Sequence, residues 1–452
     1  MKLNSLVLFA AALVGGSLAS PVFAAESVQL RIDVDRDVLP AHVTDNAIVK
    51  IALDGVKLPR KEQRPPVNLA LVIDRSGSMS GEKIEKAREA GLEAVRQLSP
   101  DDIVSIVAYD SRVETLVPAQ RVGNRRRLED AIRSLEAEGN TALYDGVVRG
   151  ADEVRRNGED GRYVNRVILL SDGQANVGPS SPDELGRLGA ALMREGIAVT
   201  TVGLGLGFNE DLMARLAQRS DGNTYFVEDS ADLPRIFAAE LGDVLNVVAR
   251  RVVIEIEFPE GVRPLRFVGR DGTIRERKAE LTLSQIYGGQ EKFALVEVEV
   301  SSAKAATTRE IARARVSYED AISQRSAVLT AKRNVQFSAT EADVVKSANH
   351  RVQADYAANE IATAKDEAIA LVDSNQRKAA GSLLRERAER LAKMAKVYGN
   401  AEMERVAAPA AAAAEWVERD GLANAERKAF RAESAQTRNQ QSSAGGYESA
   451  SR

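Results

Sequence analysis

Residues 67–79 read VNLALVIDRSGSM and begin with an apolar run that predicts a β-strand buried on both faces. The run ends at Asp74, and Ser76 and Ser78 follow at alternate positions. One carboxylate and two hydroxyls therefore stand on one tight turn at the end of a buried strand. Because such hard oxygen donors suit a hard divalent cation, we expect the remaining ligands of a metal site further along the chain.

The composition is that of an ordinary soluble protein of more than one domain. The chain has 452 residues, of which 44% are hydrophobic and 28% charged, and its net charge is −4. This length exceeds one compact core, so we expect about two or three domains. The near balance of charge argues against nucleic acid as a partner. With no cysteine and two histidines, the sequence excludes a disulfide-stapled module and argues against zinc or copper.

The N-terminal residues have the pattern of a secretory signal peptide. Lys2 precedes an apolar run at 6–18, and the VFA sequence at 22–24 places small residues at the positions read at a cleavage site. We expect cleavage after Ala24 and a periplasmic or secreted location. An uncleaved membrane anchor is the alternative, but the run is shorter than the roughly 20 residues that a span needs, and no other stretch is apolar enough.

Hydrophobic periodicity divides the rest of the chain into segments. Strand-like alternation marks 25–60 and 247–337, and we expect these two flanks to form one β-sandwich rather than two separate β modules. Strands and helices alternate over 67–245, which predicts an α/β domain with a doubly wound, mostly parallel sheet, inserted in that sandwich. Residues 340–400 predict a helical hairpin, and 401–452 are predicted to be a low-complexity, largely disordered tail.

Two later positions complete the set of oxygen donors. Thr141 lies in GNTAL at the entrance to a predicted helix, and Asp172 lies in LLSDG at the carboxyl end of the apolar strand 166–171. In doubly wound sheets, ligands bind beyond the carboxyl ends of the strands, where the strand order reverses. If the strands 67–73 and 166–171 are neighbours, the predicted metal ligands converge there: Asp74, Ser76, Ser78, Thr141 and Asp172.

In this combination the chain resembles the von Willebrand factor type A domain. The metal-ion-dependent adhesion site of that family is an Asp-x-Ser-x-Ser turn followed by a distant Thr and a distant Asp, and the resemblance covers residues 67–245. It implies that Ser76, Ser78 and Thr141 bind the cation closely, whereas Asp74 and Asp172 act partly through water. The β-flanked layout followed by helices is also similar to inter-alpha-trypsin inhibitor heavy chains and their bacterial relatives.

The donor set itself favours binding over catalysis. Neutral hydroxyls with only two carboxylates leave a divalent ion electrophilic, so a carboxylate of a partner protein can replace a bound water. Mg²⁺ suits this set, and Mn²⁺ is similar. We therefore expect a non-enzymatic module that captures an acidic residue of a protein partner. Because the helix 231–245 leads into the strand 252–258, we further hypothesise that this helix couples the metal site to the sandwich, as the last helix does in integrin-like proteins.

Two other functions remain as alternatives. The first is a metal-assisted hydrolase or phosphatase, but a dehalogenase-type phosphatase needs an acid where Ser76 stands. His42 and His350 lie outside the α/β region, so no Ser-His-Asp set is expected. The GLGLG sequence at 203–207 imitates a dinucleotide loop, but its glycine spacing predicts a tight strand-to-helix turn instead. The second alternative is a scaffold with a vestigial metal site, against which the complete ligand set argues.

Overall fold

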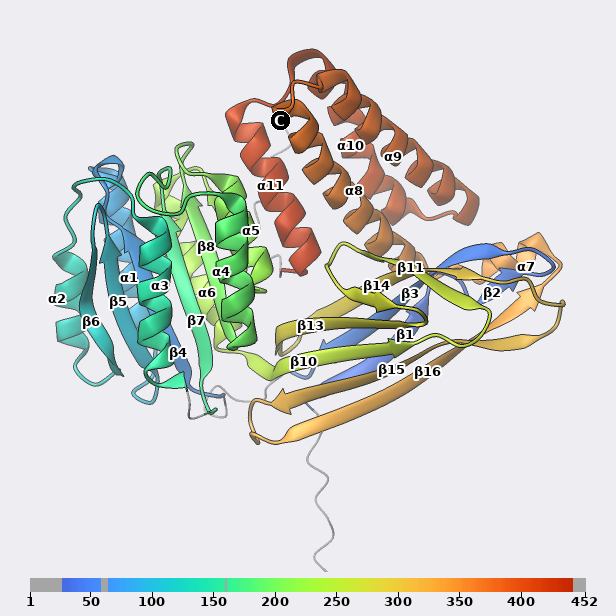
Figure 1. Cartoon of the computed structure of the whole chain (residues 1–452), viewed down its shortest axis with the longest axis horizontal. Coiled ribbons are helices and arrows are strands. Elements are labelled where there is room, and N and C mark those ends of the chain that lie inside the picture. The colour runs from blue at the N-terminus through green and yellow to red at the C-terminus, as the bar shows by residue number, and fades with distance from the viewer. Residues whose placement is uncertain (1–26, 58–63, 159–160, 442–452) are drawn as a thin grey trace, which may run out of the picture.

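The computed structural model describes residues 27–57, 64–158 and 161–441. The predicted signal peptide with its cleavage site after Ala24, part of the linker after the first flank, and the last residues of the predicted tail lie outside this description. Figure 1 shows an α/β domain, a β-sandwich and a group of C-terminal helices. Within the described ranges, no helix is both long enough and apolar enough to cross a membrane.

The α/β domain is built on a 6-stranded sheet with the order β6-β5-β4-β7-β8-β9. The strands β4, β5, β7, β8 and β9 are parallel, whereas β6 pairs antiparallel with β5 at one edge. The doubly wound, mostly parallel sheet is therefore confirmed. Its strands are β4 (Val67–Asp74), β5 (Ile103–Tyr109), β6 (Val113–Arg121), β7 (Val164–Ser171), β8 (Ile197–Leu204) and β9 (Thr224–Val227).

Helices cover both faces of this sheet, which is why the central strands are apolar throughout. Along β4, Leu69 and Leu71 belong to the core on one face, and Ala70 and Val72 to the core on the other. The first core is covered by α1 (Glu82–Gln97), α2 (Arg125–Arg133) and α6 (Leu233–Val244). The second is covered by α3 (Leu143–Arg155), α4 (Pro182–Arg194) and α5 (Glu210–Arg219).

The strand order reverses beside β4. The chain passes from β4 to β5 on one side and later returns to β7 on the other, so that Ile73 lies opposite Leu170 in the parallel register. The carboxyl ends of β4 and β7 therefore meet at the point where doubly wound sheets bind ligands. This topology brings the residues that follow Ile73 and Leu170 together.

The β-sandwich uses both flanks of the inserted domain. Its sheets have the orders β1-β3-β14-β11 and β12-β13-β10-β15-β16-β2. β3 pairs with β14 with Ala52 opposite Phe293, and strands from both flanks share one apolar core. The strands are β1 (Val28–Val34), β2 (Val38–Pro40), β3 (Asp45–Gly55), β10 (Val247–Glu257), β11 (Val262–Val268), β12 (Thr273–Arg275), β13 (Lys278–Tyr287), β14 (Glu291–Val300), β15 (Thr308–Asp320) and β16 (Ser326–Ser338).

The C-terminal helices pack on the outer face of the smaller sheet. A short helix, α7 (Glu341–Lys346), precedes the long antiparallel pair α8 (His350–Asp373) and α9 (Arg377–Tyr398). Tyr356 and Ile361 on α8 share an apolar cluster with Ile48 and Phe293 of the sheet. Residues of β3 are therefore buried on both faces, by the sandwich core and by the helices.

The prediction of a largely disordered tail over 401–452 is wrong for its described part. Residues 401–441 contain the helices α10 (Ala401–Asp420) and α11 (Asn424–Asn439). Alanine is the best helix former, and Ala407, Ala410 and Ala414 are buried along one side of α10. Their small side chains allow a close approach to α9, where a β carbon on Gly381 would lie 2.7 Å from the Ala414 carbonyl oxygen. The low complexity thus reflects tight helix packing.

The last helix, α11, runs back to the α/β domain and lies beside α5 (Figure 1). It also covers the edge strand β9. The Gln436 side chain donates a hydrogen bond of 3.1 Å to the Thr224 carbonyl oxygen, and the Thr224 amide donates one of 3.1 Å to the Gln441 side chain. Both backbone groups of Thr224 at this edge of the sheet are therefore satisfied by side chains from the C-terminal segment.

Candidate metal centre

The turn after β4 brings its oxygen atoms close together. Asp74 is the last residue of β4 and is fully buried, Ser76 is buried, and Ser78 is exposed on a short 3-10 turn. The Ser76 amide donates a hydrogen bond of 2.8 Å to Asp74 Oδ1, and the hydroxyls of Ser76 and Ser78 lie 3.1 Å apart. Burial raises the pKa of Asp74 to about 6, and hydrogen bonds from Ser76 and Ser171 partly offset this shift.

Asp172 joins this turn from the end of β7. Ser78 Oγ donates a hydrogen bond of 2.7 Å to Asp172 Oδ1. The preceding residue, Ser171, donates one of 2.8 Å to Asp74 Oδ2. The ends of β4 and β7 are thus joined by hydrogen bonds, one donated from each side. Asp172 itself is buried.

Thr141 approaches from the loop before α3. A β carbon on Gly173 would lie 3.3 Å from Thr141 Oγ1 and 3.4 Å from Ser78 Oγ, so both hydroxyls border the small space that this glycine leaves open. The loop is tied to the first turn because the Gly77 amide donates a hydrogen bond of 3.0 Å to the Gly139 carbonyl oxygen. All the predicted ligands are therefore brought to one place by β4, β7 and this loop.

Comparison with known proteins agrees with this geometry. Residues 68–239 match the family model of the von Willebrand factor type A domain. This segment is a von Willebrand factor type A (VWA) domain. A VWA domain suggests a protein-interaction module.

Relatives resemble the chain over the VWA domain and beyond. The uncharacterized protein sll0103 of Synechocystis is 28% identical over 60% of this chain and 66% of its own length. Human inter-alpha-trypsin inhibitor heavy chain H3 is 28% identical over 43% of this chain and 22% of its own length, so the chain matches only part of these relatives. A solved von Willebrand factor type A protein from Catenulispora acidiphila has the same fold, with a TM-score of 0.65 and 18% identity over 85% of this chain and 90% of its own.

Lys83 is a neighbour of the VWA site that the sequence analysis missed. Its ammonium contacts Asp172 Oδ2 and lies 3.3 Å from the Ser78 carbonyl oxygen. It therefore balances the charge of a buried carboxylate. A signal was present, because Lys83 lies in the first turn of α1, where a basic residue is unfavourable beside the positive end of the helix dipole.

Asn176 is the second residue that was missed. Its side-chain oxygen accepts a hydrogen bond of 2.8 Å from the Thr141 backbone amide. The backbone amide of Asn176 donates one of 3.2 Å to the Thr141 carbonyl oxygen. Asn176 thus fixes the backbone of Thr141 on both sides. No pattern in the sequence indicated this contact, since it joins two loops.

The donor set fits a hard divalent cation. In the described part of the chain, no three His, Cys, Asp or Glu side chains gather as a metal site of that kind. Here the carboxylates of Asp74 and Asp172 are instead combined with hydroxyls, and the Thr141 and Ser78 oxygens both border the space beside Gly173. Hydroxyl and carboxylate oxygens suit Mg²⁺ or Mn²⁺ better than soft metals.

Proposed function

We propose that the VWA domain binds Mg²⁺ or Mn²⁺ through the convergent oxygens and uses the ion to capture a carboxylate of a partner protein. The observation that carries this proposal is the convergence of Ser78, Thr141 and Asp172 around the space beside Gly173. Ser76, Ser78 and Thr141 would hold the ion through their hydroxyls, and Asp74 and Asp172 would supply the negative charge. The ion itself would supply a site for an oxygen ligand from outside.

Metal binding is tested by titrating Mg²⁺ into the purified protein in a calorimeter. The Asp172→Ala variant should lose binding, because it removes one of the two carboxylates. Asp183→Ala is the matched control, since Asp183 is an exposed aspartate in the first turn of α4 and is not part of the site. Equal Mg²⁺ binding by the wild type and Asp172→Ala would rule out the proposed site and favour a vestigial one.

Carboxylate capture is tested with bound Mn²⁺, because this ion reports on the water molecules that it coordinates. Bound Mn²⁺ accelerates the relaxation of water protons through the waters it carries. An added carboxylate such as acetate should displace a bound water and reduce this effect on the wild type. A bound Mn²⁺ whose relaxation effect is unchanged by the carboxylate would contradict capture. A pull-down in Mg²⁺ or EDTA, with Asp74→Ala as control, then identifies the partner.

A binding role is favoured over a hydrolase or phosphatase by the groups around the site. The chain has two histidines, His42 and His350, and neither lies in the VWA domain. His350 Nε2 contacts the Tyr398 carbonyl oxygen in the C-terminal helices instead. The hydrogen-bond and ion-pair partners of the Asp74 and Asp172 carboxylates include Ser76, Ser78, Ser171 and Lys83, and no histidine is among the described neighbours. Turnover of phosphoesters or peptides by the Mg²⁺-loaded protein would overturn this assignment.

We also propose that the protein acts outside the cytoplasm, in the periplasm or after secretion. The support is the sequence pattern of residues 1–24, with its apolar run and small residues before the expected cleavage site. Sequencing the N-terminus of the protein from its native host should give a mature chain that starts at Ala25. A mature chain that retains Met1 would contradict export by this route.

A further inference from the structure

The loop between β8 and α5, residues 205–209, packs directly against the metal face. A β carbon on Gly207 would lie 2.6 Å from the Asp172 carbonyl oxygen, so this glycine allows the loop backbone to contact the residue that follows β7. The Gln174 side chain donates a hydrogen bond of 3.3 Å to the Gly207 carbonyl oxygen. The position of this loop and the position of the Asp172–Gln174 segment therefore depend on each other.

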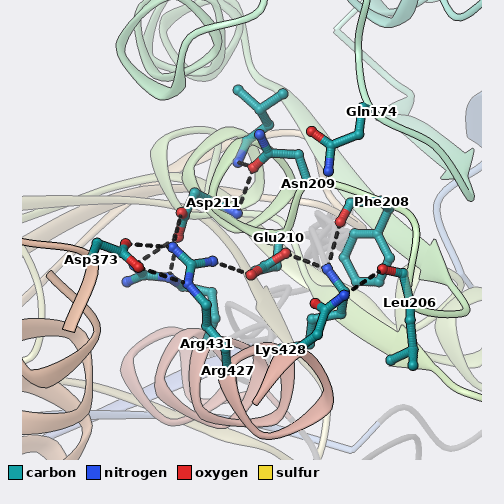
Figure 2. A network of polar contacts seen from close by, with 12 residues as sticks. Gln174, Leu206, Phe208, Asn209, Glu210, Asp211, Asp373, Arg427, Lys428 and Arg431 are labelled. Atoms are coloured by element: carbon teal, nitrogen blue, oxygen red, sulfur yellow. Dashed lines mark hydrogen bonds and ion pairs between the residues drawn. The ribbon is translucent and has the colours of Figure 1, made fainter. Parts of the chain in front are cut away.

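From its other side, the loop is held by α11 (Figure 2). Lys428 donates a hydrogen bond of 2.6 Å to the Phe208 carbonyl oxygen and also contacts the Glu210 carboxylate. Its ammonium lies 4.4 Å from the centre of the Phe208 ring. Asn424, at the start of α11, donates a hydrogen bond of 3.1 Å to the Leu206 carbonyl oxygen. Residues of α11, more than 200 positions further along the chain, thus bind the backbone of the loop.

Lys428 is 2% exposed, which makes its contacts specific to this arrangement. A buried ammonium is tolerated only where oxygen partners surround it, and here the loop carbonyl and Glu210 provide them. Neighbouring arginines strengthen the same junction. Arg427 lies 2.6 Å from both Asp211 and Asp373, and Arg431 lies 2.7 Å from Asp211 (Figure 2).

The far end of α11 is anchored elsewhere in the protein. The Asn439 side chain donates a hydrogen bond of 2.8 Å to the Gly222 carbonyl oxygen, and the Phe293 amide of the sandwich donates one of 2.9 Å to Gln440. The helix therefore connects the β8–α5 loop of the VWA domain to the β-sandwich. A movement of α11 would therefore change contacts both at the β8–α5 loop and at the β-sandwich.

We propose that Lys428 is a positioning residue for the metal site, through which α11 holds the β8–α5 loop against Asp172. The affinity of the site for its cation then depends on the docking of α11, and by thermodynamic reciprocity cation binding strengthens that docking. This inference rests on the proposed function. It concerns a route through the C-terminal helix α11, which is separate from the hypothesised route through α6.

The test compares Lys428→Met with a control that has the same chemistry. Lys428→Met keeps the apolar stem but removes the ammonium. The control is Lys278→Met, because Lys278 on β13 also pairs with a glutamate, Glu257. That pair joins two strands of the β-sandwich and touches neither α11 nor the loop. Lys428→Arg should restore the behaviour of the wild type in part.

Two measurements are made on each variant of the full chain. In EDTA, hydrogen exchange of peptides from 172–176 and 205–209 should become faster in Lys428→Met but not in Lys278→Met. In the calorimeter, Lys428→Met should bind Mg²⁺ about 10-fold more weakly, within the range typical of coupling between sites, while the control binds normally. Asn424→Ala removes one exposed contact to the loop and should change both measurements in the same direction. This variant replaces Lys428→Met in the test if Lys428→Met does not fold.

The outcomes separate this inference from the proposed function. If the wild type binds no Mg²⁺, the proposed function fails, and the exchange measured in EDTA still shows whether Lys428 positions the loop. If the wild type binds Mg²⁺ and Lys428→Met binds it equally well with unchanged exchange, the inference is overturned and the metal site stands.

Discussion

Ser78 Oγ donates a hydrogen bond of 2.7 Å to Asp172 Oδ1, although the two residues lie 94 positions apart in the chain. The contact exists because β4 and β7 are parallel neighbours and their carboxyl ends lie at the same edge of the sheet. It joins the first and the last element of the candidate metal centre. Removing the hydroxyl of Ser78 should therefore disturb the metal site without disturbing the apolar core.

Replacing Ser78 by alanine should weaken Mg²⁺ binding with little loss of stability. Ser78 is exposed and packs no apolar core, so the expected cost to the fold is the loss of its hydroxyl's hydrogen bonds with Asp172 and Ser76. Because even residues that only support metal ligands change metal affinity by about 10- to 100-fold, we expect a loss of at least about 10-fold. Calorimetric titration measures the effect. Ser80→Ala, on the same turn but outside the ligand set, is the control, and an equal loss in both variants would contradict a specific role for Ser78.

A methyl group at Gly173 should block the site from within. The added carbon would lie 3.3 Å from Thr141 Oγ1 and 3.4 Å from Ser78 Oγ, in the space that a cation needs. Gly173→Ala should therefore abolish Mg²⁺ binding while the melting temperature in EDTA stays near that of the wild type. Gly242→Ala provides a comparison, because a β carbon there meets open space. Unimpaired Mg²⁺ binding by Gly173→Ala would place the ion elsewhere.

Removing the ammonium of Lys83 should destabilise the metal-free protein. The Asp172 side chain is fully buried and would lose its cationic neighbour, whereas Lys83 is about one third exposed, at 35%. Allowing for screening by solvent, we expect Lys83→Met to cost about 1 kcal/mol, or about 2–4 °C in melting temperature for a domain of this size. Saturating Mg²⁺ should reduce the difference, because the ion balances Asp172.

Thermal melting in EDTA and in Mg²⁺ measures this effect. Lys86→Met is the matched control, since Lys86 lies on the same helix and pairs with exposed Glu89 at its surface. A deficit of Lys83→Met that persists unchanged in Mg²⁺ would show that the two cations do not share the charge of Asp172.

Lys292 should make stability depend on pH. Burial lowers its pKa to about 7, and nearby Arg270 acts in the same direction against the weaker influence of Asp221 and Asp243. Between about pH 7 and pH 10 the unfolded chain therefore binds the extra proton, so the free energy of unfolding rises with pH, by at most about 1.4 kcal/mol per unit. Below this interval both states are protonated and the contribution to the slope disappears.

Denaturation at a series of pH values checks this slope. Lys292→Met should flatten it between pH 7 and pH 9, within the interval set by the lowered pKa. Lys393→Met should leave it unchanged, because Lys393 is exposed on α9. A slope that is identical in the wild type and Lys292→Met would show that the buried ammonium does not titrate in this range.

Much of the VWA domain and its site could be predicted from the sequence. Strands buried on both faces are apolar throughout, so β4 and β7 stood out, and the ends of parallel strands necessarily meet at one edge. Asp74 and Asp172 were therefore found together. Lys83 and Asn176 were not, because their roles depend on contacts between loops and helix ends that no periodic pattern encodes.

The C-terminal helices show where composition misleads. Simple sequence around Ala407–Ala414 has the appearance of a disordered segment, but alanines at helical spacing also form a face that packs closely on a neighbouring helix. Composition alone does not separate the two cases. The contact of α11 with the VWA domain could not be predicted from the sequence either, since Lys428 and Glu210 are brought together by the tertiary structure.

The insertion of the VWA domain sets an order for folding. Lys50 on β3 pairs with Glu291 at the start of β14, 241 positions further along the chain, so the smaller sheet closes only after the whole domain has been synthesised. The strands of the VWA sheet all come from one continuous segment, and domains fold as units from the N-terminal side during synthesis. β3, which pairs with β1 on one side, therefore lacks its other partner, β14, throughout the translation of the inserted domain. A slow or failed VWA domain would leave these apolar strands open to aggregation on the ribosome.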